Sequence, residues 1–331
     1  MKKLADRIRK ADSLILSTHR QCDGDGLGAE MALFHALRAA GRKSSLINVD
    51  STPRKYRFLE PDRWIQYFEN NQELPTSVDL TLIFDTNDER LLEPLFSALK
   101  GRSKMTAFVD HHPVLNKGPH PSAESWIDIK AASTGEMAYR LIKELNLPIT
   151  RDVARCLYTS ITFDTQLYRF VRNSPVSHRI AAEMIEIGID TEDIHRHLFG
   201  NQTVQKMAFL ARALGQIEYF ADGKLAVLKL KDSDLFHYNL EPDESRDVID
   251  MLMNIETLEA AALFREDGNN QYKLSLRSKG QIEVLSVAEN IGGGGHVHAA
   301  GAFITGKYQQ VKDRVVNDLI ALLEDTKRTG T

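Results

Sequence analysis

The segment LILSTHRQCDGDGLG at positions 14–28 decides the fold of this chain. Its apolar start, Leu14–Leu16, predicts a buried strand. Apolar residues at helical spacing between Leu27 and Leu37, followed by Gly41, predict a helix. The loop between these two elements carries three candidate ligands, which are His19, Asp23 and Asp25.

Strand-to-helix loops at the carboxyl ends of strands are where open α/β sheets bind ligands. One imidazole and two carboxylates on such a loop favour a metal site, although a turn with solvated acids is the simpler alternative. A nucleotide-binding glycine loop fits less well, because Gly24, Gly26 and Gly28 are evenly spaced and do not match the G-x-G-x-x-G pattern.

Three later segments place further acids at element ends. Asp85 follows an apolar strand at 79–84, and Asp110-His111-His112 follows a strand at 105–109. Asp164 lies on a loop after a helix at 153–161. Judged alone, Asp85 has the alternative of a helix cap or turn residue. The alternative for Asp110-His111-His112 is a polar loop in which one His is hydrogen-bonded to Asp110.

The alternation of apolar strands with helices predicts an α/β fold. We expect a doubly wound, mostly parallel sheet in a catalytic domain at 1–188, a linker at 189–205 and a smaller α/β substrate-binding domain at 206–331.

The combined donor set consists of carboxylates and imidazoles without thiolates, which suits Mn²⁺ or Mg²⁺ better than structural zinc. Four carboxylates against two divalent ions give a formal charge of -4 + 4 = 0. We therefore expect two divalent cations, with Mn²⁺ preferred and Mg²⁺ or Co²⁺ as alternatives. Paired ions of this kind act on phosphoryl groups.

The second half contains four consecutive glycines, Gly292–Gly295, followed by His296. Such a run is poor material for a strand or helix interior and lets backbone N–H groups converge on an anion. Arg277, at the end of a strand at 272–278, can add a bidentate contact to phosphate. A flexible hinge is the alternative.

Composition limits the classes of partner. The 331 residues carry a net charge of -4, which gives no overall electrostatic footprint for long duplex nucleic acid. Two cysteines do not form a disulfide framework, and the start of the chain lacks an apolar signal core. We expect a cytoplasmic protein that does not bind membranes, with a homodimer as an open alternative.

Four motifs, His19…Asp23-Gly24-Asp25, Asp85-Thr86…Arg90, Asp110-His111-His112 and Asp164-Thr165, resemble those of the DHH phosphoesterase family in order and spacing. The likeness covers about residues 10–190. Two positions depart from the family pattern: Cys22 stands where proline is frequent, and Gln166 stands where glycine is usual.

The resemblance implies the roles of the site residues. One cation is expected to bind His19, Asp23 and Asp85, and a second to bind Asp25, Asp85, His111 and Asp164, so that Asp85 bridges. Asp110 would support His112, which would face the scissile phosphate.

The glycine run with His296, and Arg277-Ser278 upstream, is similar to the DHH-associated domain of the nanoRNase branch of this family. This implies a substrate-binding set of Arg277, Ser278, Gly293, Gly294, Gly295 and His296. Further candidates for the substrate cleft are Arg90, Ser133, Thr134, Gln166 and Arg169.

The resemblance implies a hydrolase that cleaves very short oligonucleotides, such as dinucleotides, to mononucleotides by attack of a hydroxide bound to two metals. One alternative is a phosphatase acting on 3′-phosphoadenosine 5′-phosphate, or a hydrolase of linear dinucleotides from cyclic-dinucleotide turnover. A nucleotide-binding module without catalysis is the alternative from a different class.

Overall fold

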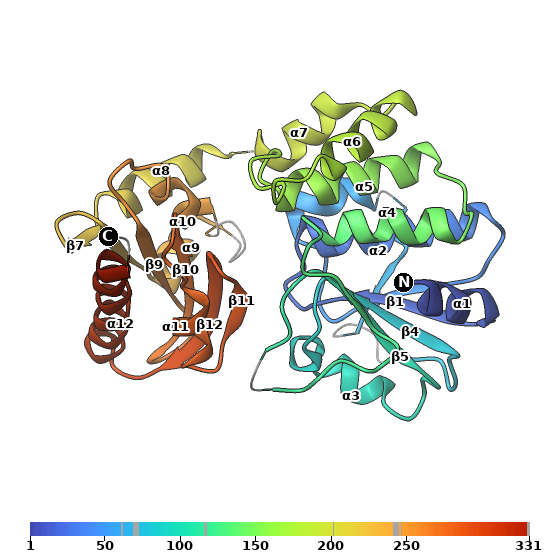
Figure 1. Cartoon of the computed structure of the whole chain (residues 1–331), viewed down its shortest axis with the longest axis horizontal. Coiled ribbons are helices and arrows are strands. Elements are labelled where there is room, and N and C mark those ends of the chain that lie inside the picture. Colours follow the sequence, from blue (N-terminus) through green and yellow to red (C-terminus); the bar gives the residue numbers. More distant parts are fainter. Residues whose placement is uncertain are drawn as a thin grey trace. The chain divides into compact units, whose positions relative to one another are not determined.

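The computed structural model describes residues 1–60, 62–68, 73–115, 118–200, 202–240, 245 and 247–329. The chain divides into two compact units, residues 1–201 and 202–331 (Figure 1). Each unit contains its own six-stranded sheet.

The sheet of the first unit is parallel throughout and has the order β3-β2-β1-β4-β5-β6. The strand order reverses its direction of growth at β1, because β2 lies on one side of β1 and β4 on the other. Its strands are β1 (Leu14–Thr18), β2 (Ser45–Asn48), β3 (Ile65–Tyr67), β4 (Leu80–Phe84), β5 (Thr106–Asp110) and β6 (Trp126–Ile127).

Both faces of this sheet are covered, as a doubly wound fold requires. Leu14 and Leu16 of β1 belong to a large core with the helices of one face, whereas Ile15 packs in a second core with Leu95 and Leu99 of α3. The helical elements of the unit are α1 (Lys2–Lys10), α2 (Gly24–Ala39), η1 (Arg54–Leu59), η2 (Glu89–Leu92), α3 (Leu95–Leu99), α4 (Thr134–Glu144), α5 (Arg151–Asp164), α6 (Val176–Glu186) and α7 (Thr191–Phe199).

The second unit has a mixed sheet with the order β11-β12-β10-β9-β8-β7. Only the pair β8–β9 is parallel among its described neighbours. Its strands are β7 (Glu218–Phe220), β8 (Leu225–Leu230), β9 (Ala260–Glu266), β10 (Gln271–Ser278), β11 (Gly294–His296) and β12 (Ala299–Thr305). Its helices are α8 (Val204–Leu214), α9 (Asp232–His237), α10 (Asp247–Leu252), α11 (Leu285–Glu289) and α12 (Tyr308–Thr329).

The expected fold class is confirmed, since a parallel α/β sheet is followed by a smaller α/β unit. The segment expected as a linker, 189–205, differs. It contains α7, whose Ile194 and Leu198 are buried in the core of the first unit.

Within the described residues, every helix is either too short or too polar to cross a bilayer.

Helices α2 and α5 approach each other closely, and Gly28 makes that approach feasible. A Cβ atom at Gly28 would lie 2.7 Å from the carbonyl oxygen of Cys156 and 2.8 Å from the Cβ of Ser160. Because a backbone carbonyl cannot rotate away, a side chain at this position would push the two helices apart.

We therefore expect Gly28→Ala to lower the free energy of unfolding by about 1–3 kcal/mol, as overpacked cores do. Thermal or urea unfolding measures the change. The matched control is Gly215→Ala, because a Cβ there meets its nearest neighbour at an ordinary 3.5 Å. Equal stability of the two variants would contradict this packing argument.

Candidate metal centre

The connection between β1 and α2 carries the first group of side chains. His19 follows β1 directly, and Asp23 is the N-cap of α2. The Asp23 carboxylate accepts hydrogen bonds from the backbone N–H groups of Asp25 at 3.1 Å and Gly26 at 3.4 Å. Asp25, expected on the loop, lies in the first turn of the helix. The cap therefore fixes the directions of both carboxylates.

Asp85 ends the neighbouring strand β4 in an unusual conformation. Its φ is +62°, in the left-handed region that L-residues with a side chain rarely occupy. Such strain persists only where surrounding contacts hold it, and it concentrates at functional sites. Here the Thr134 hydroxyl donates to Asp85 Oδ1 at 2.9 Å, and the backbone N–H of Asp85 donates to the Val109 carbonyl at 3.0 Å.

Two groups of donors meet around Asp85. In the first, His19 Nε2 lies 3.9 Å from Asp23 Oδ2 and 3.6 Å from Asp85 Oδ2. In the second, His111 Nε2 lies 3.4 Å from Asp25 Oδ2, 3.5 Å from Asp164 Oδ2 and 3.6 Å from Asp85 Oδ1. Each group offers three ligand atoms within 4.8 Å of one another. The two oxygens of Asp85 thus face different groups.

The sequence predicted a loop position for Asp164. The structure instead has Asp164 as the last residue of α5. The first turn of α2, the end of β4, the segment after β5 and the end of α5 are therefore the four places that converge. Between 26 and 60 positions separate consecutive members of the set Asp25, Asp85, His111 and Asp164 along the chain, so only the tertiary fold brings them together.

The N-terminus of α4 binds the Asp25 carboxylate. Backbone N–H groups of Thr134 and Gly135 donate to Asp25 Oδ2 and Oδ1 at 2.8 and 3.0 Å. The Ser160 hydroxyl on α5 donates to Oδ1 as well. An anion at a helix N-terminus is favoured by the orphan N–H groups and the helix dipole.

These contacts bear on two predicted cleft residues. Ser133 and Thr134 are fully buried. The Ser133 hydroxyl caps α4 by accepting from the backbone N–H of Glu136. Their observed contacts therefore support Asp25 and Asp85. Ser160 was missed by the sequence reasoning, because no motif connects a mid-helix serine to an acid 135 positions away.

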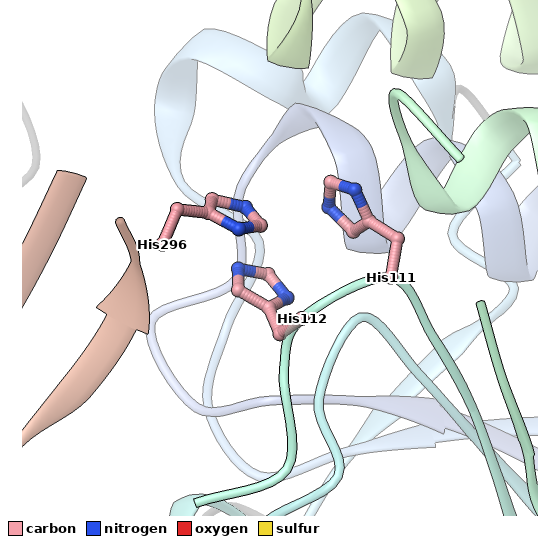
Figure 2. Close-up of side chains that lie close together, drawn as sticks. All are labelled: His111, His112 and His296. Atoms are coloured by element: carbon pink, nitrogen blue, oxygen red, sulfur yellow. The ribbon is translucent and has the colours of Figure 1, made fainter. Parts of the chain in front are cut away.

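His111 and His112 follow β5 and have different surroundings (Figure 2). His111 is fully buried, and its Nδ1 lies 3.3 Å from the Ala131 carbonyl oxygen. Burial, together with the charge of the neighbouring His112, lowers the pKa of His111 to about 3. His111 is thus a neutral imidazole, the form that ligates metals.

His112 is paired with the buried carboxylate of Asp110. Its Nδ1 lies 2.8 Å from Asp110 Oδ1, and Asn87 Nδ2 donates to Asp110 Oδ2 at 2.6 Å. Burial alone would lower the pKa of His112, but the charge and hydrogen bond of Asp110 outweigh it, with help from Asp85 and Asp164, and raise the pKa to about 10. His112 is therefore a cation in the metal-free protein.

Burial and mutual repulsion oppose ionisation of the three clustered acids. Burial raises the pKa of Asp25 strongly, and the charges of Asp85 and Asp164 raise it further. The pKa of Asp85 is also raised by burial, then by Asp23. Burial raises the pKa of Asp164 to about 7, although His112 opposes the shift. Added positive charge would relieve this repulsion.

Gln166, at a position where the family pattern has glycine, lies in a left-handed turn after α5. Gln166 has φ +47°, followed by Leu167 at +61° and Tyr168 at +65°. Glycine adopts this left-handed conformation without steric cost, whereas glutamine adopts it only under constraint. The Leu167 N–H donates to the Thr162 carbonyl at 2.9 Å and the Tyr168 N–H to the Thr165 hydroxyl at 3.0 Å, which hold the turn.

The two arginines predicted for the cleft are both exposed. The Arg169 guanidinium carbon lies 5.5 Å from the ring centroid of Phe170. Arg90 pairs with Asp88 at 2.6 Å. Both retain solvent-facing surface for an anionic ligand.

In the second unit, Arg277 and Ser278 lie at the end of β10. Arg277 Nε donates to Asp250 Oδ1 at 2.9 Å. The Ser278 hydroxyl donates to the Ile282 carbonyl oxygen and also lies 3.1 Å from His298 Nδ1. Ser278 therefore holds the turn between β10 and α11.

The glycine run differs from the expected loop. Gly294–His296 form strand β11, which pairs with β12 through Gly294↔Gly301 and His296↔Ala299 (Figure 2 labels His296). A Cβ at Gly293 would lie 2.0 Å from the Gly301 carbonyl oxygen, and Gly295 has φ +132°. The glycines are thus required by close backbone packing.

Two of the backbone N–H groups expected to bind an anion already make hydrogen bonds within the protein. The N–H groups of Gly292 and Gly293 donate to the carbonyls of Glu289 and Ala288 at the end of α11. Any anion contact from this run would come from the outer edge of β11, which is an edge strand of the sheet.

Comparison with known proteins agrees with this architecture. Residues 13–161 match the model of the DHH family N-terminal domain, and residues 222–325 match that of the DHHA1 domain. The chain is 26% identical over 332 aligned residues to the bifunctional oligoribonuclease and PAP phosphatase NrnA of Thermus thermophilus, covering 100% of this chain and 95% of the relative. It is 25% identical to the NrnA of Mycoplasma genitalium, covering 95% and 94%.

A crystal structure of an exopolyphosphatase-related protein from Bacteroides fragilis has the same fold. It superposes with a TM-score of 0.85 at 21% identity and covers 99% of this chain and 98% of its own. One matched domain lies within each structural unit, and the expected resemblance is confirmed: the chain belongs to the DHH family, with an N-terminal DHH domain followed by a DHHA1 domain.

Proposed function

We propose that this chain is a hydrolase of the phosphoesterase class that cleaves very short oligonucleotides, dinucleotides above all, with two divalent cations. The observation that carries the proposal is the position of Asp85, whose Oδ2 faces His19 at 3.6 Å and whose Oδ1 faces His111 at 3.6 Å. A carboxylate with one oxygen toward each of two donor groups is suited to bridge two ions.

The donor set fits divalent cations. Carboxylate oxygens and imidazole nitrogens are ligands for Mn²⁺ and Mg²⁺, and the raised pKa values of Asp25, Asp85 and Asp164 reflect charge that a cation would neutralise. We assign His19, Asp23 and Asp85 to one ion. We assign Asp25, Asp85, His111 and Asp164 to the other. Mn²⁺ is the proposed ion because imidazole accompanies the carboxylates.

When bound, such a pair of cations supplies Lewis acidity toward the phosphoryl oxygens and lowers the pKa of a water molecule. The chain's own residues supply orientation and a proton. Asp25 is held by the α4 N-terminus and Ser160, so its direction is fixed before any ligand arrives. His112, charged through Asp110, is placed to donate a hydrogen bond to a phosphate oxygen or a proton to the leaving oxygen.

We further propose that the second unit binds the nucleotide. Arg277 supplies a guanidinium that Asp250 orients, and His296 and the edge of β11 supply additional donors. The relatives named above act on oligoribonucleotides and on PAP by their names, which supports a substrate of nucleotide size.

A phosphatase activity on 3′-phosphoadenosine 5′-phosphate is the second candidate. It is favoured by the second activity in the names of the relatives, and it uses the same donors. Linear dinucleotides from cyclic-dinucleotide turnover belong to the same substrate class. A binding module without turnover is disfavoured because every proposed ligand residue is present.

The substrate proposal predicts a length dependence. With Mn²⁺, the purified protein should hydrolyse labelled dinucleotides faster than oligonucleotides of 5 to 20 residues, on the order of 10-fold or more in kcat/KM. Labels at the 5′ and 3′ ends give the direction of attack. A faster reaction with the bisphosphate than with any dinucleotide would reverse the order of the two candidates.

The bridging role of Asp85 predicts a severe loss on substitution. Asp85→Asn should reduce kcat by about 100-fold or more, because an amide cannot neutralise two cations. The matched control is Asp152→Asn, an exposed carboxylate on α5, which should keep wild-type activity. Undiminished hydrolysis by the pure Asp85→Asn variant would refute the bridging role of Asp85.

The raised pKa of Asp164 predicts how stability depends on pH. Its folded value is about 7 against an unfolded value of 3.8, so the metal-free folded state holds an extra proton between them. This group's contribution to the free energy of unfolding is therefore greatest below pH 4 and falls as the pH rises to about 7. Mn²⁺ should raise Tm more at pH 8 than at pH 5.5, where protons compete for the ligands.

Thermal unfolding with EDTA and with Mn²⁺ measures both effects. Asp164→Asn serves as the comparison, because it removes the titrating group. In EDTA the variant should gain stability relative to wild type as the pH rises from 5 to 8. A constant difference between the two proteins over this range contradicts the prediction.

A further inference from the structure

Asn48 is the last residue of β2 and lies outside the ligand set described above. It is 2% exposed, and the strand that carries it is the neighbour of β1 on the side away from β4. A buried amide must satisfy its donors and acceptors within the protein, so its partners show what it holds in place.

The Asn48 side chain joins β1 to α2. Its Oδ1 accepts from the backbone N–H of Thr18 at 3.1 Å and from the Ser17 hydroxyl at 3.3 Å. Its Nδ2 donates to Glu30 Oε1 at 2.6 Å. This orientation of the amide is the one that pairs donors with acceptors on both sides, since the reverse would place the NH₂ group against the Thr18 N–H.

Glu30 is a suitable anchor because it is neutral near pH 7. It is fully buried on α2, and burial raises its pKa to about 8 in spite of the hydrogen bond from Asn48. A protonated carboxyl offers Asn48 an acceptor without placing a full charge in the core.

Thr18 is held from both sides. On the side opposite Asn48, its hydroxyl donates to the Phe84 carbonyl at 3.0 Å, and the two residues are register partners in the β1–β4 pair. The residue after Thr18 is His19, and the residue after Phe84 is Asp85. The bonds at Thr18 therefore fix the last point of each strand before the chain enters the donor group.

We infer that Asn48, anchored by Glu30, is a positioning residue that holds His19 against Asp85 for cation binding. This inference rests on the proposed function, and it concerns the His19–Asp23–Asp85 group rather than the group around His111. The side-chain hydrogen bonds of Asn48 go to Ser17, Thr18 and Glu30 rather than to His19 or Asp85. It acts through the Thr18 backbone, as the hydrogen-bonded partners of metal ligands commonly do.

The experiment is titration of the metal-free protein with Mn²⁺ by calorimetry, together with Tm in EDTA. Asn48→Leu removes all three side-chain hydrogen bonds of Asn48 at similar volume, and we expect it to weaken one of two Mn²⁺ sites by about 10–100-fold while the other keeps its affinity. The matched control is Asn317→Leu, the same exchange at an exposed position of α12 in the second unit, which should bind both ions as wild type does.

Asn48→Ser is the second variant, because it leaves a hydroxyl and room for water if the leucine variant does not fold. It should show the same loss at one site. A folded Asn48 variant that binds both ions with wild-type affinity overturns the inference, even where its Tm has fallen. Failure of the wild-type protein to bind two Mn²⁺ ions would instead refute the proposed function, which keeps the two failures distinct.

Discussion

The crowding of carboxylates around Asp85 is the constraint on which the rest of the first unit depends. Asp25, Asp85 and Asp164 all lie within reach of His111, and each resists ionisation because it is desolvated and faces other acids. Such a cluster is costly to keep in a folded protein. Bound cations would offset this cost, which is why the proposed metal site is assigned to this cluster.

The protein offsets part of this cost with its helix ends and strand ends. The first turn of α4 points two N–H groups at Asp25, and Asp23 caps α2. The left-handed Asp85 is held by Thr134 and by β5. Because hydrogen bonds fix these side chains without a ligand, little ordering would remain for the binding of the proposed cations.

The second unit places its donors by a different device. The glycine run is shaped by packing against β12, as the close approach of Gly293 to Gly301 demonstrates. Glycine at these positions brings the backbone of an edge strand close to its neighbour, and His296 follows at the end of β11. The backbone donors left for a ligand are consequently those of the outer edge.

The amino-acid sequence by itself determined the fold class and the residue types of the site. Apolar strands ending in Asp85 and Asp110, and a helix start at Ser133, follow local rules of periodicity and capping, which act over a few residues. The resemblance of four motifs to those of the DHH family then predicted that these acids share one site.

The tertiary structure alone decided the contacts between distant segments. Ser160 on Asp25, Asn48 on Thr18 and the division of Asp85 between two donor groups join residues that are 26 to 135 positions apart. No local propensity encodes such contacts, because they arise only when the parallel sheet brings its strand ends to one edge and the helices pack against it.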